Sequence, residues 1–283
     1  MTGRRSATGR TPMLDADGLG YEDHGDGEAI LMIHGTGIGV TSFVPLMNEA
    51  VLADRYRLIR YHRRGYSGSV PLAGEDKLSG QEYGALLARD AVTVLDHAGV
   101  QRAHIVGHSS GGWVAVQLAL DAPDKVHSLT LIEPAIYAIE PSWTPMILEF
   151  LNPLYDLNER DPNAAVEMLA KNGEGEDWRS FADTLPGGAE QWITDTKAML
   201  FEFRIVQDWT FGPSESSRIT SPVLYMTGGK SMSFHEDVKA LFTSRVPQTE
   251  GVIIPDEGHM MFTQRPEAAA RAIASFLGRR PMT

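Results

Sequence analysis

The stretch 103–112 constrains the fold more than any other part of the sequence, because it requires a sharp turn between two regular elements. It reads Ala-His-Ile-Val-Gly-His-Ser-Ser-Gly-Gly. The apolar run at its start predicts a buried strand, and apolar residues at helical spacing follow over 113–119. Ser109 lies at the apex between them, with Gly107 and Gly111 two residues to either side. In so tight a turn only small side chains fit next to a serine with a strained backbone, so we interpret the stretch as presenting the Ser109 hydroxyl to a cleft.

Strands and helices alternate along most of the chain. The segment 13–25 alternates around Asp17-Gly18, which predicts a short β-hairpin. Apolar runs predict further strands at 29–33, 57–61, 103–106, 126–133, 222–227 and 251–254. Helical patterns are expected from Thr41 to about Ala53 and over 79–98, 113–119, 234–245 and 266–277. This alternation predicts an α/β fold with a doubly wound, mostly parallel sheet.

Four polar residues lie at or just after the carboxyl ends of predicted strands, where such sheets bind their ligands: His34, Ser109, Glu133 and His259. His34 lies too far out to act in proton transfer, and we expect it to be a structural residue of its turn. The other three are candidates to meet. A serine nucleophile needs a base, and that base needs a third group to orient it. His259, within Gly258-His259-Met260 between the last strand and the last helix, is the strongest base candidate among nine histidines.

The segment 134–213 has a different character from the rest of the chain. It is helical in pattern, is interrupted by Pro and Gly, and contains four of the five tryptophans. It holds 14 acidic and 5 basic residues, and therefore most of the net charge of −12. We expect a helical cap at 134–213, inserted into a core made of 13–133 and 214–283, and a disordered tail at 1–12.

The order of motifs resembles the alpha/beta-hydrolase fold family. The motifs are His34-Gly35-Thr36-Gly37, the loop 64–69, Gly107-His108-Ser109-Ser110-Gly111 and the late Gly258-His259, and the resemblance covers about residues 13–277. It implies that Ser109 is the nucleophile and His259 the base, that the backbone N–H groups of Thr36 and Ser110 form the oxyanion hole, and that 134–213 is the cap.

The acid of the triad departs from the family pattern. Family members usually carry an aspartate shortly after the strand at 223–227, whereas this chain reads Gly228-Gly229-Lys230-Ser231 there. Serine cannot hold a negative charge against an imidazolium. Glu133, at the end of the strand before the cap, is the favoured replacement, similar to the arrangement in zearalenone-type lactonases and haloalkane dehalogenases. Glu236 and Asp237 remain open as alternatives.

The predicted activity is that of a serine hydrolase acting through an acyl-enzyme on a carboxylic ester or lactone. Large apolar groups in the cap predict a medium-sized hydrophobic substrate, and the side chains expected to contact it are Trp143, Met146, Trp192 and Met260. Hydrolysis of a carbon–carbon bond in a diketone is one alternative, because it uses the same triad. A ligand-binding receptor on a hydrolase scaffold is the other.

Composition excludes several other classes of function. The absence of cysteine rules out disulfides and thiolate chemistry, and the net charge of −12 argues against nucleic acid or an anionic membrane as a partner. No apolar run approaches membrane-spanning length, so we expect a cytoplasmic protein. We expect neither a cofactor nor a metal site: Val40 interrupts the glycine pattern of a dinucleotide loop, and His104 and His108 do not share a helix face. Arginines 63 and 64 are expected to brace the backbone of their loop, and the sequence leaves a homodimer open.

Overall fold

The computed structural model describes residues 13–36, 39–74, 77–205 and 209–282. The tail expected at 1–12 lies outside the described residues. The hairpin expected at the start is confirmed: β1 (Leu14–Ala16) pairs antiparallel with β2 (Leu19–His24). Asp17 and Gly18 form its turn with φ values of 55° and 88°, which is the left-handed geometry that a two-residue hairpin turn requires.

A single sheet of eight strands forms the centre of the molecule, in the order β1-β2-β4-β3-β5-β6-β7-β8. Its remaining strands are β3 (Glu28–Ile33), β4 (Tyr56–Tyr61), β5 (Ala103–His108), β6 (Val126–Ile132), β7 (Val223–Gly228) and β8 (Thr249–Ile254). β2 runs antiparallel to β4, whereas the neighbours from β4 to β8 are all parallel. The predicted doubly wound, mostly parallel sheet is therefore confirmed, with β5 at its centre.

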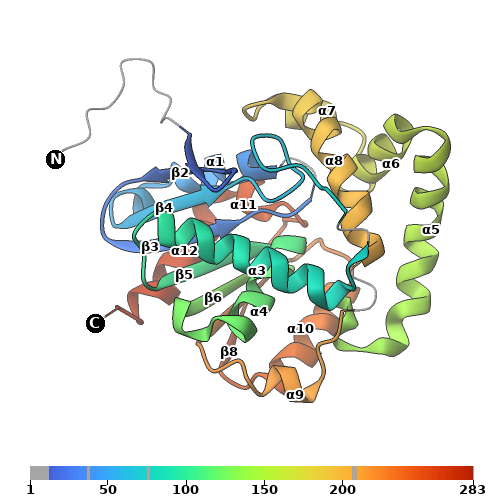
Figure 1. Ribbon diagram of the computed structural model, residues 1–283. Helices are drawn as coiled ribbons and strands as arrows, with labels where there is room; N and C mark the ends of the chain where they lie inside the picture. The colour runs from blue at the N-terminus through green and yellow to red at the C-terminus, as the bar shows by residue number, and fades with distance from the viewer. Residues whose placement is uncertain (1–12, 37–38, 75–76, 206–208, 283) are drawn as a thin grey trace.

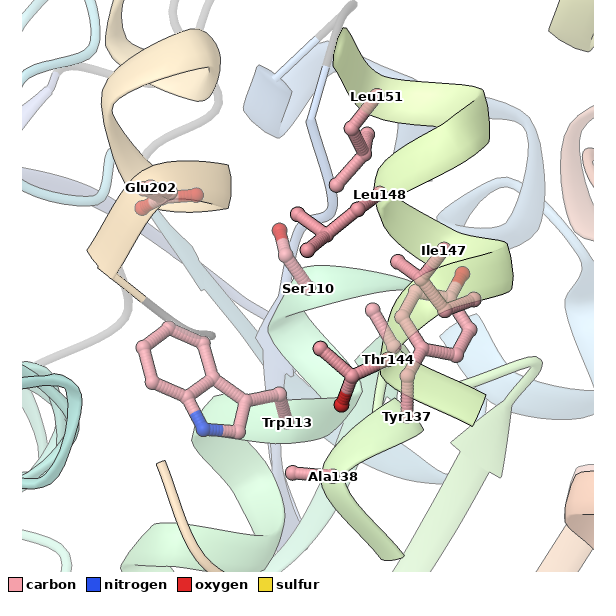
Figure 2. A pocket seen from close by; sticks show the side chains of 10 residues that line it. Ser110, Trp113, Tyr137, Ala138, Thr144, Ile147, Leu148, Leu151 and Glu202 are labelled. Atoms are coloured by element: carbon pink, nitrogen blue, oxygen red, sulfur yellow. The ribbon is translucent and has the colours of Figure 1, made fainter. Parts of the chain in front are cut away.

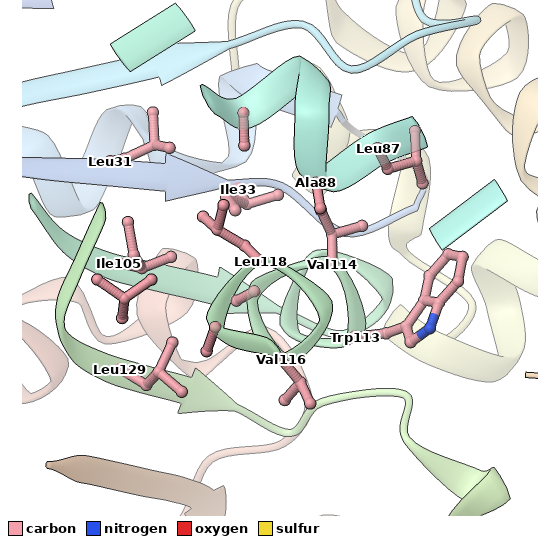
Figure 3. Close-up of a cluster of buried hydrophobic side chains, with 14 of the residues drawn as sticks. Leu31, Ile33, Leu87, Ala88, Ile105, Trp113, Val114, Val116, Leu118 and Leu129 are labelled. Carbon is pink, nitrogen blue, oxygen red and sulfur yellow. The ribbon is translucent and has the colours of Figure 1, made fainter. Parts of the chain in front are cut away.

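Helices cover both faces of this sheet (Figure 1). One face carries α3 (Gly80–His97), α4 (Ser110–Asp121) and α10 (Phe234–Arg245), whose apolar side chains pack in one cluster with the strands. Figure 3 shows part of that cluster, with Leu31, Ile33 and Ile105 of the strands beside Val114 and Leu118 of α4. The other face carries α1 (Val44–Met47), α2 (Ala50–Ala53), α11 (Met261–Gln264) and α12 (Pro266–Gly278).

The helix expected from Thr41 to about Ala53 is wrong as a continuous element. The chain forms a 3₁₀ turn (Gly39–Phe43) and then the short helices α1 and α2. Glu49 adopts an extended conformation with ψ of 120° between α1 and α2, so the helical hydrogen bonds cannot run through. Phe43, Leu46 and Leu52 nevertheless all belong to the apolar cluster on this face of the sheet, which explains why their spacing in the sequence looks helical.

The segment between β6 and β7 is helical. After two 3₁₀ turns (Tyr137–Ile139 and Pro141–Trp143) come α5 (Thr144–Arg160), α6 (Pro162–Glu174), α7 (Trp178–Ala182), α8 (Gly188–Ile205) and the short α9 (Pro213–Ser216). Helices α5 to α8 lie together beyond one end of the sheet (Figure 1). Trp209 and Phe211 instead belong to the large core cluster, where Trp209 contacts Trp113. Among the described residues, no helix combines the length and the apolar character needed to cross a membrane.

Candidate active site

The turn around Ser109 has the strained geometry that the sequence predicts. Ser109 follows β5, has a φ of 50° and ψ of −121°, and is 7% exposed at the start of α4. A Cβ on Gly107 would lie 2.5 Å from the Gly111 carbonyl oxygen, and one on Gly111 would lie 2.1 Å from the Ile33 carbonyl oxygen. Both contacts are far below van der Waals distance, so the two glycines are required for strand β5, strand β3 and helix α4 to approach this closely.

The turn after β3 lies directly against the serine. A Cβ on Gly35 would lie 2.9 Å from the Ser109 Cβ, which places the His34-Gly35-Thr36 turn beside the elbow. His34 is fully buried; its Nδ1 donates to the Gly35 carbonyl at 2.7 Å, and its Nε2 accepts from the Arg63 backbone N–H at 3.1 Å. These two bonds give His34 the structural role expected of it, but the expectation that it lies far out is wrong, because it is fully buried. Thr36, next in the chain, is half-buried, and Ser110 is the first residue of α4.

Glu133 and His259 are brought into direct contact. Glu133 follows β6 and is fully buried, with its backbone N–H bonded to the Met226 carbonyl of β7. Its Oε2 accepts a 2.7 Å hydrogen bond from His259 Nδ1, and its Oε1 accepts a 2.7 Å bond from the Gly228 backbone N–H. Glu133 also has a positive φ of 40°, which is uncommon for a residue with a side chain. Such local strain at the end of a strand is typical of residues that the surrounding structure holds for a function.

The electrostatics keep the Glu133 carboxylate charged. Burial acts to raise its pKa, but the hydrogen bond and charge of His259, the charge of His235 and the Gly228 N–H together lower it to about 2. With Glu133 ionised and accepting the hydrogen bond, His259 holds its proton on Nδ1.

The alternative acids do not reach this histidine. Glu236 and Asp237 lie in the first turn of α10 and are both exposed, and Glu236 pairs with Lys239 on the helix surface. Successive residues of a helix point about 100° apart, so the inward direction in this turn is taken by His235, which is buried. The structure thus places Glu133, and neither Glu236 nor Asp237, beside His259.

His108 links the loop of His259 to the serine. It is buried immediately before Ser109, and its Nε2 donates to the His259 carbonyl at 3.1 Å. Its ring lies 4.5 Å from the His259 ring, measured between centroids. Burial and the charge of His259 lower the pKa of His108 well below its ordinary value, so it acts as a neutral donor. Sequence reasoning gave His108 no part in the site, although its position next to the serine was the available signal.

An apolar pocket opens beside the elbow, between α4, α5 and α8 (Figure 2). Ser110 contributes to its wall, as does Ala135, whose N–H donates to the Ser109 carbonyl at 2.8 Å. The other lining residues are Trp113, Tyr137, Ala138, Thr144, Ile147, Leu148, Leu151 and Glu202.

The four side chains expected to contact the substrate lie outside this pocket. Met146 is 47% exposed on α5, and Trp143 packs against Phe234 of α10. Trp192 packs against Trp178 inside the helical segment, and Met260 is buried in the apolar cluster beneath the sheet. Trp143, Met146, Trp192 and Met260 thus do not line this pocket, and their contact with a substrate stays a prediction. Trp143 and Trp192 pack against Phe234 and Trp178, and Ile147 and Leu148 of α5 line the pocket instead.

A buried ion pair joins α8 to the loop after β4 at the edge of this pocket. Arg63 is fully buried, and its Nη2 lies 2.8 Å from Glu202 Oε2, 3.0 Å from Ser110 Oγ and 2.9 Å from Tyr66 Oη. Burial acts to lower the pKa of Arg63, but the Glu202 carboxylate raises it above its ordinary value, so the guanidinium stays charged. No sequence pattern indicated this contact, because the two residues are 139 positions apart.

The alpha/beta hydrolase family model matches residues 30–272 of the chain. The chain is 42% identical over 116 residues to "Putative carbamate hydrolase RutD" of Variovorax paradoxus, a match over 40% of this chain that spans only 41% of the relative. It is 27% identical over 265 residues to the 2-hydroxy-6-oxononadienedioate/2-hydroxy-6-oxononatrienedioate hydrolase of Cupriavidus pinatubonensis, covering 89% of this chain and 87% of that one. Among solved structures, the enol-lactonase of Burkholderia xenovorans LB400 is similar in fold, with a TM-score of 0.75 at 19% identity over 92% of this chain and 96% of that one.

Proposed function

Because the chain belongs to the alpha/beta hydrolase family, we propose that it is a serine hydrolase that cleaves a carboxylic ester or lactone through an acyl-enzyme. The observation that carries the proposal is the 2.7 Å contact between Glu133 Oε2 and His259 Nδ1, next to a strained serine at the end of β5. A family model alone does not specify chemistry; further support comes from a serine, a carboxylate and a histidine that follow β5, β6 and β8 of one sheet.

In this mechanism His259 removes the Ser109 proton as the serine attacks the substrate carbonyl. The Glu133 carboxylate holds His259 with its proton on Nδ1, so that Nε2 can accept the Ser109 proton. The same carboxylate stabilises the imidazolium that then forms. The Gly228 N–H holds the second oxygen of Glu133, which prevents the carboxylate from rotating away from His259. His259 then returns the proton to the leaving alcohol, and water attacks the acyl-enzyme by the same route.

The backbone N–H groups of Ser110 and Thr36 stabilise the oxyanion of the tetrahedral intermediate. Ser110 begins α4, so its N–H is one of the unpaired donors at a helix start, and Thr36 follows the turn that contacts Ser109. Donors aimed at a charge that develops only in the transition state are typically worth about 3–4 kcal/mol each.

The substrate is a small hydrophobic ester or lactone. Leu148, Leu151 and Ile147 give the pocket an apolar wall, and its one charged lining residue, Glu202, is already paired with Arg63. An anionic substrate would therefore find no uncommitted cation among the residues that line the pocket. This argues against carbon–carbon hydrolysis of a dicarboxylate, the kind of substrate named for the similar hydrolase of Cupriavidus pinatubonensis. The overall charge of −12 likewise fits neither a nucleic acid nor an anionic membrane as partner, and we place the enzyme in the cytoplasm.

Labelling with a fluorophosphonate probe tests the proposal. The wild type should gain one adduct by intact mass, peptide mapping should locate the adduct on Ser109, and both Ser109→Ala and heat-denatured wild type should gain none. A folded wild type that forms no adduct would contradict the proposal and favour a ligand-binding receptor. Turnover of p-nitrophenyl esters and of aromatic lactones, compared with a vinylogous diketone, then separates ester or lactone cleavage from carbon–carbon cleavage.

A further inference from the structure

His235 is a buried histidine that the proposed mechanism does not use. It lies in the first turn of α10, is 4% exposed, and its ring is stacked on that of His259 with 5.4 Å between centroids and 24° between planes. Its Nε2 lies 3.6 Å from Glu133 Oε2, which is too long for a hydrogen bond. Its Nδ1 is buried and has no hydrogen-bond partner among the described residues. Burying a polar group without a partner costs free energy, so the position of this imidazole calls for a physical reason.

Three potential metal ligands converge at this point. Glu133, His235 and His259 each offer one ligand atom, and these atoms all lie within 4.8 Å of one another. Two imidazoles and a carboxylate are a ligand set typical of zinc. Zn–N and Zn–O bonds of about 2.0–2.2 Å place tetrahedral ligand atoms roughly 3.3–3.5 Å apart. The contacts of Glu133 Oε2 with His259 Nδ1 at 2.7 Å and with His235 Nε2 at 3.6 Å bracket that spacing, and the two stacked imidazole rings would have to turn their ligand nitrogens toward a shared ion.

We propose that Glu133, His235 and His259 bind a divalent transition-metal ion such as Zn²⁺, and that this ion inhibits the enzyme. From the sequence we expected no metal site, and Glu133 and His235 are about a hundred positions apart in it. Binding of the ion does not depend on the proposed function, whereas the inhibition does.

The inhibition follows from the two nitrogens of one imidazole. In the metal-free enzyme His259 donates a hydrogen bond from Nδ1 to Glu133, and Nε2 is the nitrogen that accepts the Ser109 proton in the proposed mechanism. A metal on Nδ1 takes the lone pair of that nitrogen, so the single proton of the neutral ring must be carried by Nε2. No net proton is lost from His259, but the ring can then no longer accept the Ser109 proton. The ion therefore removes the base while leaving the nucleophile in place.

The surroundings indicate reversible binding rather than a permanent metal centre. The His259 side chain is 28% exposed whereas those of Glu133 and His235 are 0% and 6% exposed, so an ion reaches the site past His259. The Gly228 N–H orients the carboxylate, as expected for a second layer around a metal. The Nδ1 of His235 has no such partner among the described residues, and a missing partner of this kind typically lowers metal affinity by about 10–100-fold.

A binding measurement on the full chain tests the site without relying on activity. Ser109→Ala, which keeps all three ligands, is titrated with Zn²⁺ against a chromophoric chelator. We expect one ion per chain, bound roughly tenfold or more weakly after His235→Phe, which keeps the ring stacking but removes the ligand nitrogen. His97→Gln, a substitution at an exposed histidine of α3, is the control and should not change the titration. If His235→Phe is not folded by circular dichroism, His235→Gln takes its place.

A kinetic measurement tests the inhibition. On an ester that the wild type hydrolyses, Zn²⁺ should inhibit at the concentrations at which it binds, and EDTA should restore the rate. The His235 variant, compared with its own metal-free rate, should need roughly tenfold more Zn²⁺ for the same inhibition. Equal Zn²⁺ affinity with and without His235, or no binding by Ser109→Ala, would overturn the site. Binding that depends on His235 but leaves turnover unaffected would overturn the inhibition alone. A chain that hydrolyses no ester but binds Zn²⁺ through His235 would contradict the proposed function and leave the site standing.

Discussion

Two buried carboxylates, Glu133 and Glu202, are held by different kinds of partner. Glu133 comes from the end of a core strand and accepts hydrogen bonds from a histidine and a backbone N–H. Glu202 comes from helix α8 and is paired with the guanidinium of Arg63, with the hydroxyls of Tyr66 and Tyr83 at 3.3 and 3.4 Å. The histidine beside Glu133 can gain and lose a proton, whereas the arginine beside Glu202 cannot. Glu133 is therefore suited to assist proton transfer, whereas Glu202 is suited to hold α8 against the core.

Neutralising the core carboxylate should have the largest effect. Glu133→Gln keeps the size of the side chain but places an amide where His259 needs a charged acceptor, so we expect kcat/KM to fall by about 10³–10⁴-fold. Steady-state kinetics on an activated ester measure this. The exposed substitutions Glu236→Gln and Asp237→Asn are matched controls and should change kcat/KM less than about threefold. The reverse ranking would move the acid to α10 and remove the contrast between the two carboxylates.

Breaking the Arg63–Glu202 pair should reduce stability more than it changes the chemistry. Arg63→Met leaves Glu202 buried without a cation, and we expect the free energy of unfolding to fall by about 3–5 kcal/mol. Urea denaturation gives this value. The double variant Arg63→Met/Glu202→Leu should recover much of the loss, because two apolar side chains then replace the pair. A loss below about 1 kcal/mol in the single variant would show that the pair does not hold α8 to the core.

Narrowing the pocket should alter substrate selection without touching the charged groups. Ala138→Phe fills space beside Thr144 and Leu148, so long acyl chains should lose binding free energy of about 0.8 kcal/mol per excluded methylene. Comparing kcat/KM for p-nitrophenyl esters of increasing chain length measures this. Met146→Phe, on the exposed side of α5, is the control and should leave the chain-length profile unchanged. If Met146→Phe shifts the profile and Ala138→Phe does not, the pocket described here is not the acyl site.

The smallest effect is expected at a second carboxylate of α8. Asp195 is 2% exposed, accepts from the Ser67 N–H at 2.8 Å, and burial raises its pKa above its ordinary value. A raised carboxyl pKa favours folding at low pH, and that contribution is lost as pH rises through the folded-state value, so the charged form costs stability at pH 7. Asp195→Asn should therefore be neutral or stabilising by up to about 1 kcal/mol at pH 7. The difference from wild type should shrink as pH falls towards 4, and urea denaturation at several pH values would show a gain that grows instead if the sign is wrong.

The turn at Ser109 could be predicted from the sequence because short-range backbone contacts require it. Gly107 and Gly111 are required by contacts with residues close in the chain or on the adjacent strand, and such requirements leave a spacing that can be recognised. The preference for Glu133 over Glu236 and Asp237 followed from its position at a strand end and from Ser231 in the place of the usual aspartate, and the structure puts Glu133 beside His259. The broken helix at 41–53 shows the limit, because apolar spacing does not reveal an extended residue such as Glu49.

The pocket wall, the Arg63–Glu202 pair and the position of His235 were decided only by the tertiary structure. Trp143, Met146, Trp192 and Met260 have the composition expected of a substrate pocket, but composition does not say which face of a helix is turned toward the elbow. That choice depends on how the helices pack against one another and on the sheet. Arg63 and Glu202 meet across 139 residues, and no pattern within either segment encodes the other. Thus the sequence determined the order of strands and the strained turn at the nucleophile through short-range sterics, whereas the side-chain packing of distant segments selected the groups that surround it.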